Sequence, residues 1–181
     1  MRIYKNKNVF ESALDRIRYL YDEFGENVVV SMSGGKDSTT VLELALIVAK
    51  EKNLLPVKVF WLDQELEFQA TADYMKSVMY RPDVKPYWFQ IPFNLVNATS
   101  AVEDNYFTMA WGEGVDWVRE QDPISIKGKI VQAERFYEMF PALIKWMFGN
   151  EKACYLTGLR TEESPSRFVG LTQRAKYKFI T

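Results

Sequence analysis

The segment VVVSMSGGKDSTTVLELAL, residues 28–46, constrains the fold more than any other part of the sequence. A β-branched apolar run ends at a turn that contains two adjacent glycines, and a helical apolar pattern begins directly after it. A short strand that is apolar on both faces is typical of the centre of a parallel sheet, where both faces are covered. The segment therefore predicts a buried strand, a tight turn and a buried helix in immediate succession.

The rest of the chain continues this alternation of strands and helices. Further strands are predicted at 56–63, 85–91, 153–159 and 176–181, and helices at 8–24, 36–51, 66–80 and 131–148. Such alternation favours a doubly wound α/β fold with a mainly parallel five-stranded sheet and helices on both faces. We expect residues 1–181 to form a single domain, with an aromatic insertion at about 92–130 where the alternation is lost.

The composition excludes several kinds of chemistry. The 181 residues include no histidine and one cysteine, Cys154. A Ser-His-Asp triad, an internal disulfide, and a haem, iron–sulfur or zinc site within one chain are therefore not expected. Any metal should be a hard cation held by oxygen atoms, and Mg²⁺ that arrives with a phosphate is the leading candidate.

The net charge and the apolar segments bear on partners and location. A formal net charge of −1 gives no support for direct binding to nucleic acid or to an acidic membrane. No stretch approaches the ~20 apolar residues of a membrane span, and the first ten residues lack the apolar core of a signal peptide. We expect a cytoplasmic protein without membrane contact, and an aromatic content of 15% permits a homodimer.

The turn after the first strand has the chemistry of a phosphate site. Amides at the start of the following helix lack partners, and Gly34 and Gly35 let a bulky anion approach the backbone. The helix dipole and Lys36 add positive charge, and two serine hydroxyls can donate hydrogen bonds. The predicted phosphate cradle consists of Ser33, Gly34, Gly35, Lys36, Asp37 and Ser38.

Two segments resemble known nucleotide-binding motifs. SGGKDS, residues 33–38, resembles the PP-loop of the N-type ATP pyrophosphatases and the phosphoadenosine phosphosulfate (PAPS) reductases. It is not a Walker A loop, whose two glycines stand apart. GLRTEESPSR, residues 158–167, resembles the G-x-R-x-x-(E/Q)-S-x-x-R element of PAPS reductase-like proteins. The resemblance implies a Rossmann-like fold of the adenine nucleotide alpha hydrolase type and a site for ATP or a PAPS-type nucleotide.

The second segment is expected to complete the site from another strand end. Gly158 allows close approach of the backbone to a ligand, and Arg160 offers a planar fork of donors to phosphate or sulfate oxygens. The resemblance implies that Arg160 and Arg167 lie over the sulfate or phosphate end of the nucleotide, and that Lys36 and Arg160 are catalytic. Taken alone, the two arginines would more often form surface ion pairs.

The acid that closes the second predicted strand has several possible roles. Asp63, in WLDQELE, resembles the acidic position at the end of the family's second strand, where most PAPS reductases carry a D-T-G-type sequence. Asp63 could hold the Mg²⁺ of a nucleotide together with Asp37, contact a ribose, or cap the helix that begins near Leu66. The sequence leaves these alternatives open.

The middle of the chain resembles one subgroup of the family. VNATSAVEDNYFTMAWGEGVDWVREQDPISI resembles the aromatic insertion of immunoglobulin-binding regulator A-like proteins of enterobacteria and their phage-borne relatives. The opening IYKNKNVFESALDRIRYLYDEF is also typical of them. Trp111, Trp117 and Arg119 could shape an acceptor pocket, but a small aromatic core is the favoured interpretation for the tryptophans.

Three functions follow from the resemblance. The leading hypothesis is adenylation at the α-phosphate of ATP with release of pyrophosphate, for example before sulfur transfer. The second is a reductase of PAPS or adenosine phosphosulfate (APS) that uses a thiol in trans, because the reductases' C-terminal cysteine tail is absent and Cys154 fits a small buried hydrophobe. The third is a non-catalytic nucleotide-binding module that regulates a ParB-like partner.

Overall fold

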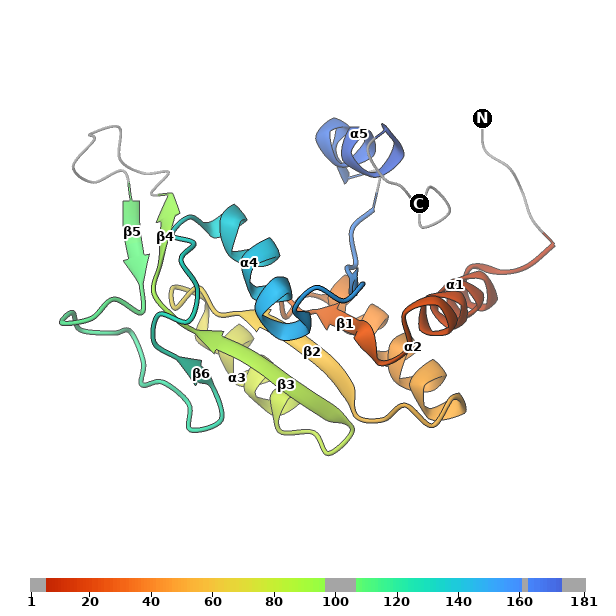
Figure 1. Ribbon diagram of the computed structural model, residues 1–181, viewed down its shortest axis with the longest axis horizontal. Coiled ribbons are helices and arrows are strands. Elements are labelled where there is room, and N and C mark those ends of the chain that lie inside the picture. The colour runs from red at the N-terminus through yellow and green to blue at the C-terminus, as the bar shows by residue number, and fades with distance from the viewer. Residues whose placement is uncertain (1–5, 97–106, 161–162, 174–181) are drawn as a thin grey trace.

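A computed structural model describes residues 6–96, 107–160 and 163–173 (Figure 1), with side chains through residue 169. Its helices are α1 (Val9–Phe24), the 3₁₀ helix η1 (Gly25–Asn27), α2 (Lys36–Glu51), α3 (Gln69–Met79), α4 (Phe136–Phe148) and α5 (Pro165–Gln173). Its strands are β1 (Val28–Ser31), β2 (Val57–Leu62), β3 (Val84–Gln90), β4 (Phe93–Val96), β5 (Phe107–Ala110), β6 (Ile126–Lys127) and β7 (Cys154–Leu156).

The main sheet has five strands in the order β6-β3-β2-β1-β7, and all of its neighbouring strands are parallel. This arrangement confirms the predicted doubly wound α/β, Rossmann-like fold. From β1 the chain moves outward through β2, β3 and β6, and it then returns to the other side of β1 as β7. The strand order therefore reverses at β1, and ligands of such sheets bind beyond the carboxyl ends of the strands at that point.

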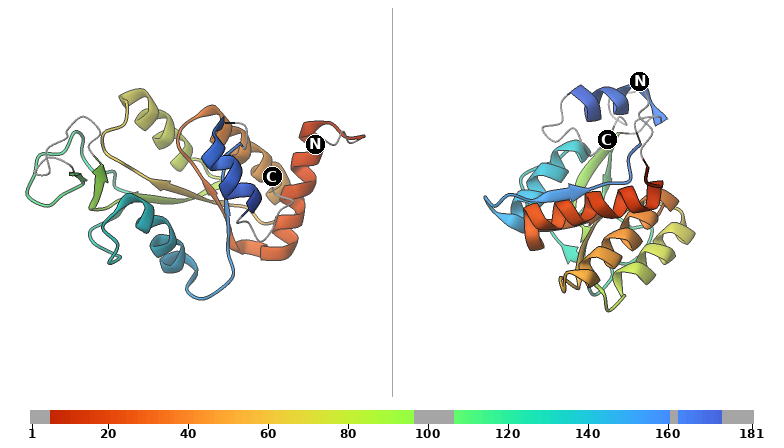
Figure 2. Two further views of the ribbon diagram at one scale, coloured as in Figure 1. Left: turned by 90° about the horizontal axis from the view of Figure 1, so that it is seen from above. Right: turned by 90° about the vertical axis from the view of Figure 1, so that its right-hand side faces the viewer.

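Helices cover both faces of the sheet, as predicted (Figure 2). Successive side chains of a strand point to opposite faces, so Val30 packs with Leu42 and Met75 on the side of α2 and α3. Val29, its neighbour, packs with Leu143 of α4 on the other side. A strand buried on both faces explains the unbroken run of valines, and it fixes β1 at the centre of the domain's core.

The predicted insertion contains regular structure that the sequence did not reveal. β4 and β5 form an antiparallel hairpin apart from the main sheet. β6 is the fifth strand of the sheet, and it pairs Ile126 and Lys127 with the end of β3. A strand of two residues leaves no periodic pattern. The strand predicted at 176–181 lies outside the described residues.

Two predicted helices start later than expected. The helix predicted at 66–80 begins at Gln69, and the helix predicted at 131–148 begins at Phe136. By contrast, α2 spans Lys36–Glu51, the predicted range. Within the part of the chain that the structure describes, none of the helices has the length and apolar character needed to cross a membrane.

Candidate functional site

The loop between β1 and α2 has a backbone that suits glycine. Gly34 has a φ of +73°, and a Cβ at this position would lie 2.6 Å from Cγ2 of Thr71 on α3. Gly35 is the N-cap of α2, so no side chain at the cap can accept hydrogen bonds from the first helical turn. The first-turn amides therefore remain directed toward whatever binds beyond the helix.

Hydrogen bonds within the loop hold it in place. The buried hydroxyl of Ser38 donates to the carbonyl of Gly35 at 2.9 Å, and it accepts from the amide of Ser33 at 3.3 Å. The hydroxyl of Thr39 also donates to Gly35, at 2.9 Å. The Ser38 hydroxyl was expected to donate to a ligand, but in the structure it donates to the Gly35 carbonyl within the loop. Its main role in the structure is to brace the cradle, whereas the side chain of Ser33 is exposed.

Gly158 brings the segment after β7 against the first turn of α2. A Cβ at Gly158 would lie 2.9 Å from the carbonyl carbon and oxygen of Asp37 and 3.0 Å from the amide of Ser38. These neighbours are main-chain atoms, which cannot rotate away as a side chain can. The sequence assigned this glycine to close approach of a ligand. The structure instead requires glycine there for contact between two backbones, and that contact joins the two predicted motifs.

A cleft of about 750 Å³ opens where the two motifs meet. This volume is within the range of small-molecule sites. The predicted site residues that line it are Ser33, Gly35, Lys36, Asp37, Ser38, Gly158 and Arg167. Gly34, Arg160 and Asp63 do not line it. The opposite wall is aromatic and comes from Phe136, Tyr137 and Phe140 of α4 and Tyr155 of β7.

The charged groups at the cleft differ in their partners. Among the described residues, no carboxylate pairs with the exposed ammonium of Lys36. Arg160 lies 3.6 Å from the Asp37 carboxylate and 3.3 Å from that of Glu163. Glu163 also forms an ion pair with Arg167. Lys36 is thus directly available to an anion. Both arginines are paired with Glu163, so an anion that binds them must either displace Glu163 or bind beside it.

Asp63 has a buried carboxylate whose two oxygens are occupied by donors. Its side chain is fully buried. One oxygen accepts from the amide of Glu65 at 2.8 Å and from the Arg119 guanidinium. The other accepts from Trp88 at 3.0 Å and from Gln90 at 2.9 Å. These four donors favour a structural role, and the proposed Mg²⁺ role of Asp63 stays a prediction.

The tryptophans of the insertion pack over this buried acid. Trp111 is 1% exposed, and its indole N–H donates to the carbonyl of Asp63 at 2.8 Å. The Trp117 ring meets Trp111 edge-on at 5.7 Å, and the Arg119 guanidinium lies 5.4 Å from the Trp111 ring centre. Their contacts match an aromatic core under a long loop, the interpretation that the sequence favoured. None of the three lines the cleft.

Cys154 lies at the wrong end of its strand to act in the cleft. It begins β7 and is paired with Val28 at the amino end of β1. Burial raises the pKa of its thiol to about 11, so almost none of it is thiolate near neutral pH. This position and pKa support the sequence interpretation of Cys154 as a small hydrophobe. Next along the strand, Tyr155 donates to the hydroxyl of Ser31 at 2.6 Å, and burial raises its pKa.

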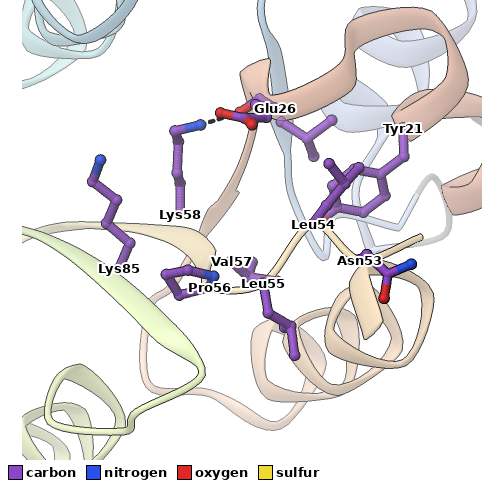
Figure 3. Close-up of a pocket in the computed structure, with 10 residues that line it drawn as sticks. Tyr21, Glu26, Asn53, Leu54, Leu55, Pro56, Val57, Lys58 and Lys85 are labelled. Atoms are coloured by element: carbon purple, nitrogen blue, oxygen red, sulfur yellow. Dashed lines mark hydrogen bonds between the residues drawn. The ribbon is translucent and has the colours of Figure 1, made fainter. Parts of the chain in front are cut away.

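Another hollow lies at the opposite edge of the sheet, at the amino ends of β1, β2 and β3 (Figure 3). Its volume is about 280 Å³. Lys58 and Lys85 flank it, but the Lys58 ammonium donates to the main-chain carbonyl of Glu26. Burial lowers the pKa of Lys58. Neither predicted motif reaches this edge, so the cleft after β1 remains the better candidate site.

Sequence reasoning missed the residues that complete the cleft from other elements. Phe136 and Tyr137 come from α4, and no local pattern distinguishes them from ordinary helix residues. Glu163 did have a signal, because it occupies the acidic position of the quoted G-x-R-x-x-(E/Q)-S-x-x-R element. Its bridging role between the arginines required the structure.

A parallel sheet with a glycine-rich loop at its reversal point is the architecture of many nucleotide-binding α/β proteins. The family model "Phosphoadenosine phosphosulfate reductase domain" matches residues 27–174, and the chain belongs to that family. The chain is also similar to the uncharacterized protein YbdN of Escherichia coli (strain K12), with 30% identity over 99% of this chain. It spans 46% of the length of that relative. The finer subgroup and a phage origin stay predictions.

The carboxylates of the cleft bear on whether the protein could hold a metal by itself. Within the described ranges, no group of three or more carboxylate or cysteine side chains could hold a metal ion. Asp37 and Glu163 are the carboxylates that line the cleft, and both lie next to arginines. A Mg²⁺ ion would therefore fit if it is bound mainly by the nucleotide phosphates, and Asp37 is the protein group that would hold it. It would supply neutralisation of phosphate charge.

Proposed function

We propose that this protein binds an adenine nucleotide with its phosphates in the loop 33–38, and that it acts at the α-phosphate of ATP. One observation carries the proposal. The start of α2, which has no side-chain cap, and the Lys36 ammonium, which pairs with no carboxylate among the described residues, meet in a cleft. This cleft lies at the point where the strand order reverses. Membership of the PAPS reductase family supports a nucleotide as the ligand.

The proposed reaction transfers an adenylyl group. A nucleophilic oxygen of the acceptor attacks the α-phosphorus, a new P–O bond forms, and the bond to the bridging oxygen of pyrophosphate breaks. The acceptor's proton passes to solvent, and pyrophosphate leaves with its charge. Lys36 and the amides of residues 34–38 stabilise the negative charge on the phosphate oxygens, a form of catalysis that requires no histidine. Arg160 and Arg167 leave Glu163 and bind the same phosphates.

The test is binding and turnover with a matched pair of variants. Calorimetry with ATP, PAPS and APS should show binding of at least one of them to wild-type protein, and Lys36→Ala should weaken it by tenfold or more. Lys50→Ala, in the last turn of the same helix, is the control and should bind normally. Pyrophosphate release from Mg-ATP should fall with Lys36→Ala as well. No binding of any of the three nucleotides would contradict the proposal.

A second proposal is reduction of PAPS or APS with a thiol supplied by another molecule. It is favoured by the family and by the position of Cys154, which is partly buried at the amino end of β7, away from the cleft. The thiolate would attack sulfur and form an S–S bond while the S–O bond to the nucleotide phosphate breaks, so that the adenosine phosphate leaves. A second thiol would then attack the thiosulfonate adduct, form a disulfide and release sulfite. Reduction that depends on added thioredoxin or glutathione and is unchanged in Cys154→Ala would support it. Loss of reduction in Cys154→Ala would overturn it.

A third proposal is regulation without turnover, with a ParB-like protein as the partner. In this case a bound nucleotide would displace Glu163 from both arginines without being turned over. Under this proposal nucleotide binding persists while pyrophosphate release and reduction are both absent. Lys36→Ala separates the cases, since an enzyme loses turnover whereas a scaffold retains its partner.

A further inference from the structure

A second hollow of about 600 Å³ lies next to the cleft, at the start of α4. Phe136 and Tyr137 line both spaces, so the two are adjacent. The far wall is the β4–β5 hairpin, which lies next to the start of α4 (Figure 1). A parallel bridge between Asn94 and Arg135, with a 2.7 Å hydrogen bond from the Asn94 amide to the Glu134 carbonyl, holds these elements together.

Flat side chains dominate the walls of the second hollow. Tyr137 is 84% exposed and Phe107 is 43% exposed, although large aromatic side chains are usually covered. The guanidinium of Arg135 lies 6.0 Å from the centre of the Phe107 ring. Aromatic rings and guanidinium planes at one opening are the surfaces on which proteins stack flat heterocycles. The hollow therefore suits a planar ligand.

Two side-chain amides supply the polar groups of the hollow. Gln64 and Asn94 line it, and neither amide group has a side-chain hydrogen-bond partner among the described residues. Gln64 directly follows Asp63, whose buried carboxylate is held by four donors, so its main chain is well fixed. A side-chain amide offers a donor and an acceptor side by side, which is the pattern that matches the edge of a nucleobase.

The charges around the hollow favour a neutral ligand over an anionic one. Arg135 lines an adjoining hollow together with Glu134 and Glu138. Lys129 pairs with Glu134 at 3.3 Å, so the positive and negative charges there balance. The cleft and the hollow together exceed the ~1,000 Å³ upper range of a single small-molecule site. The cleft already has its own aromatic wall for a nucleotide, so the adjoining space is available to a second molecule.

We propose that the second hollow is the acceptor subsite, and that it binds a planar nitrogen heterocycle of the nucleobase type. Phe107, Phe136 and Tyr137 stack on its faces, and Gln64 and Asn94 bind its edge. This inference rests on the proposed function, because an acceptor must lie next to the α-phosphate that it attacks. The heterocycle can come from a free nucleoside or from a base in a single strand, and the two sources share this chemistry.

The experiment measures binding of nucleosides with and without a nucleotide in the cleft. Adenosine, guanosine, cytidine, uridine and a single-stranded hexanucleotide are titrated into the protein alone and into protein saturated with α,β-methylene ATP. Ribose serves as the negative probe. The expected result is that at least one base-containing probe binds in the presence of the ATP analogue. Gln64→Leu should weaken that probe by about tenfold and leave the affinity for the analogue unchanged within about twofold.

Gln69→Leu, an exposed amide on α3 away from both spaces, is the matched control and should leave every affinity unchanged. The proposal is overturned if no base-containing probe binds, if the probes compete with the analogue for one place, or if Gln64→Leu weakens the analogue equally. If the analogue does not bind but a nucleoside does, and Gln64→Leu weakens the nucleoside, the proposed ATP chemistry fails while the heterocycle site stands. Comparison of the affinity for the hexanucleotide with the affinities for the nucleosides shows whether the base comes from a single strand or from a free nucleoside.

Discussion

Two neighbouring strands, β1 and β2, end at the same edge of the sheet in polar segments, yet the two segments have opposite surroundings. After β1, the loop 33–38 leaves Lys36 and the start of α2 facing a cleft. After β2, Asp63 and Glu65 are buried under the insertion, where Trp111 and Arg119 bind them. A polar segment at the end of a strand is therefore not in itself a site. What matters is whether another part of the chain supplies its partners.

The difference follows from the charge of each segment. The loop after β1 presents donors, and the described part of the chain offers its Lys36 no carboxylate. The segment after β2 presents acceptors, and the insertion brings donors to them. The amides of Trp111 and Val118 bind the two carboxylate oxygens of Glu65 at 2.6 and 2.9 Å. Substitutions in each of the two segments therefore test this difference.

The largest expected effect is a loss of stability when the buried segment after β2 is changed. Asp63→Ala removes a buried carboxylate and leaves Arg119, Trp88 and Gln90 without their acceptor. We expect a loss of about 3–5 kcal/mol in the free energy of unfolding, measured by urea denaturation. Asp37→Ala, which changes the partly exposed acid of the loop, is the control and should cost less than about 1 kcal/mol. Equal losses for the two variants would contradict the comparison.

A smaller effect should separate the two glycines of the loop. Gly34→Ala forces a Cβ onto a backbone with a φ of +73°, 2.6 Å from the Thr71 side chain, and should cost about 1–3 kcal/mol of unfolding free energy. Gly35→Ala places its Cβ in ordinary contact, 3.6 Å from the Ser33 hydroxyl, at a φ of −85° that alanine accepts. Because alanine is a poorer N-cap than glycine, this variant should lose up to about 1 kcal/mol, which is less than the loss in Gly34→Ala. If thermal unfolding ranked the two variants in the reverse order, the described loop geometry would be wrong.

A third prediction concerns the acid that lies at the open site. Glu163→Gln removes the charge that pairs with Arg160 and Arg167 and that would repel a phosphate. The affinity for ATP or PAPS should rise by up to about fivefold, as expected for partly exposed ion pairs. Calorimetry at low salt measures it, with the exposed Glu113→Gln of the insertion as the control. A lower affinity in Glu163→Gln would mean that Glu163 positions the arginines instead of competing for them.

The smallest effect is a dependence of stability on pH at Asp122, a buried acid of the insertion that covers Asp63 and Glu65. Burial pushes the pKa of Asp122 up, but hydrogen bonds from Lys76 and Tyr80 outweigh it and hold the pKa below its ordinary value. A carboxyl with a lowered pKa in the folded state stabilises the fold above its ordinary pKa, and this stabilisation is lost as the pH falls. Urea midpoints at about pH 6 and about pH 3 should therefore differ less in Asp122→Asn than in wild type. An unchanged difference would exclude this contribution.

The residues that could be predicted from the sequence lie close together along the chain. The loop between β1 and α2 could be placed because strand, turn and helix are contiguous, and α2 was predicted with its observed bounds for the same reason. The contact of Gly158 with Asp37 and the aromatic wall from α4 both join distant segments. Periodicity and local motifs carry no information about such contacts, so these features were missed or given a different reason.

The sequence by itself determined the fold class, the central valine strand, and the loop that presents amides and Lys36 at its end. These follow from local rules, since side-chain periodicity and glycine conformations act over a few residues. Only the tertiary structure decided which strand end stays open, because that depends on which donors and acceptors the insertion brings across the sheet edge. The two-residue strand β6 and the hollow beside α4 also arise only when segments far apart in the chain meet.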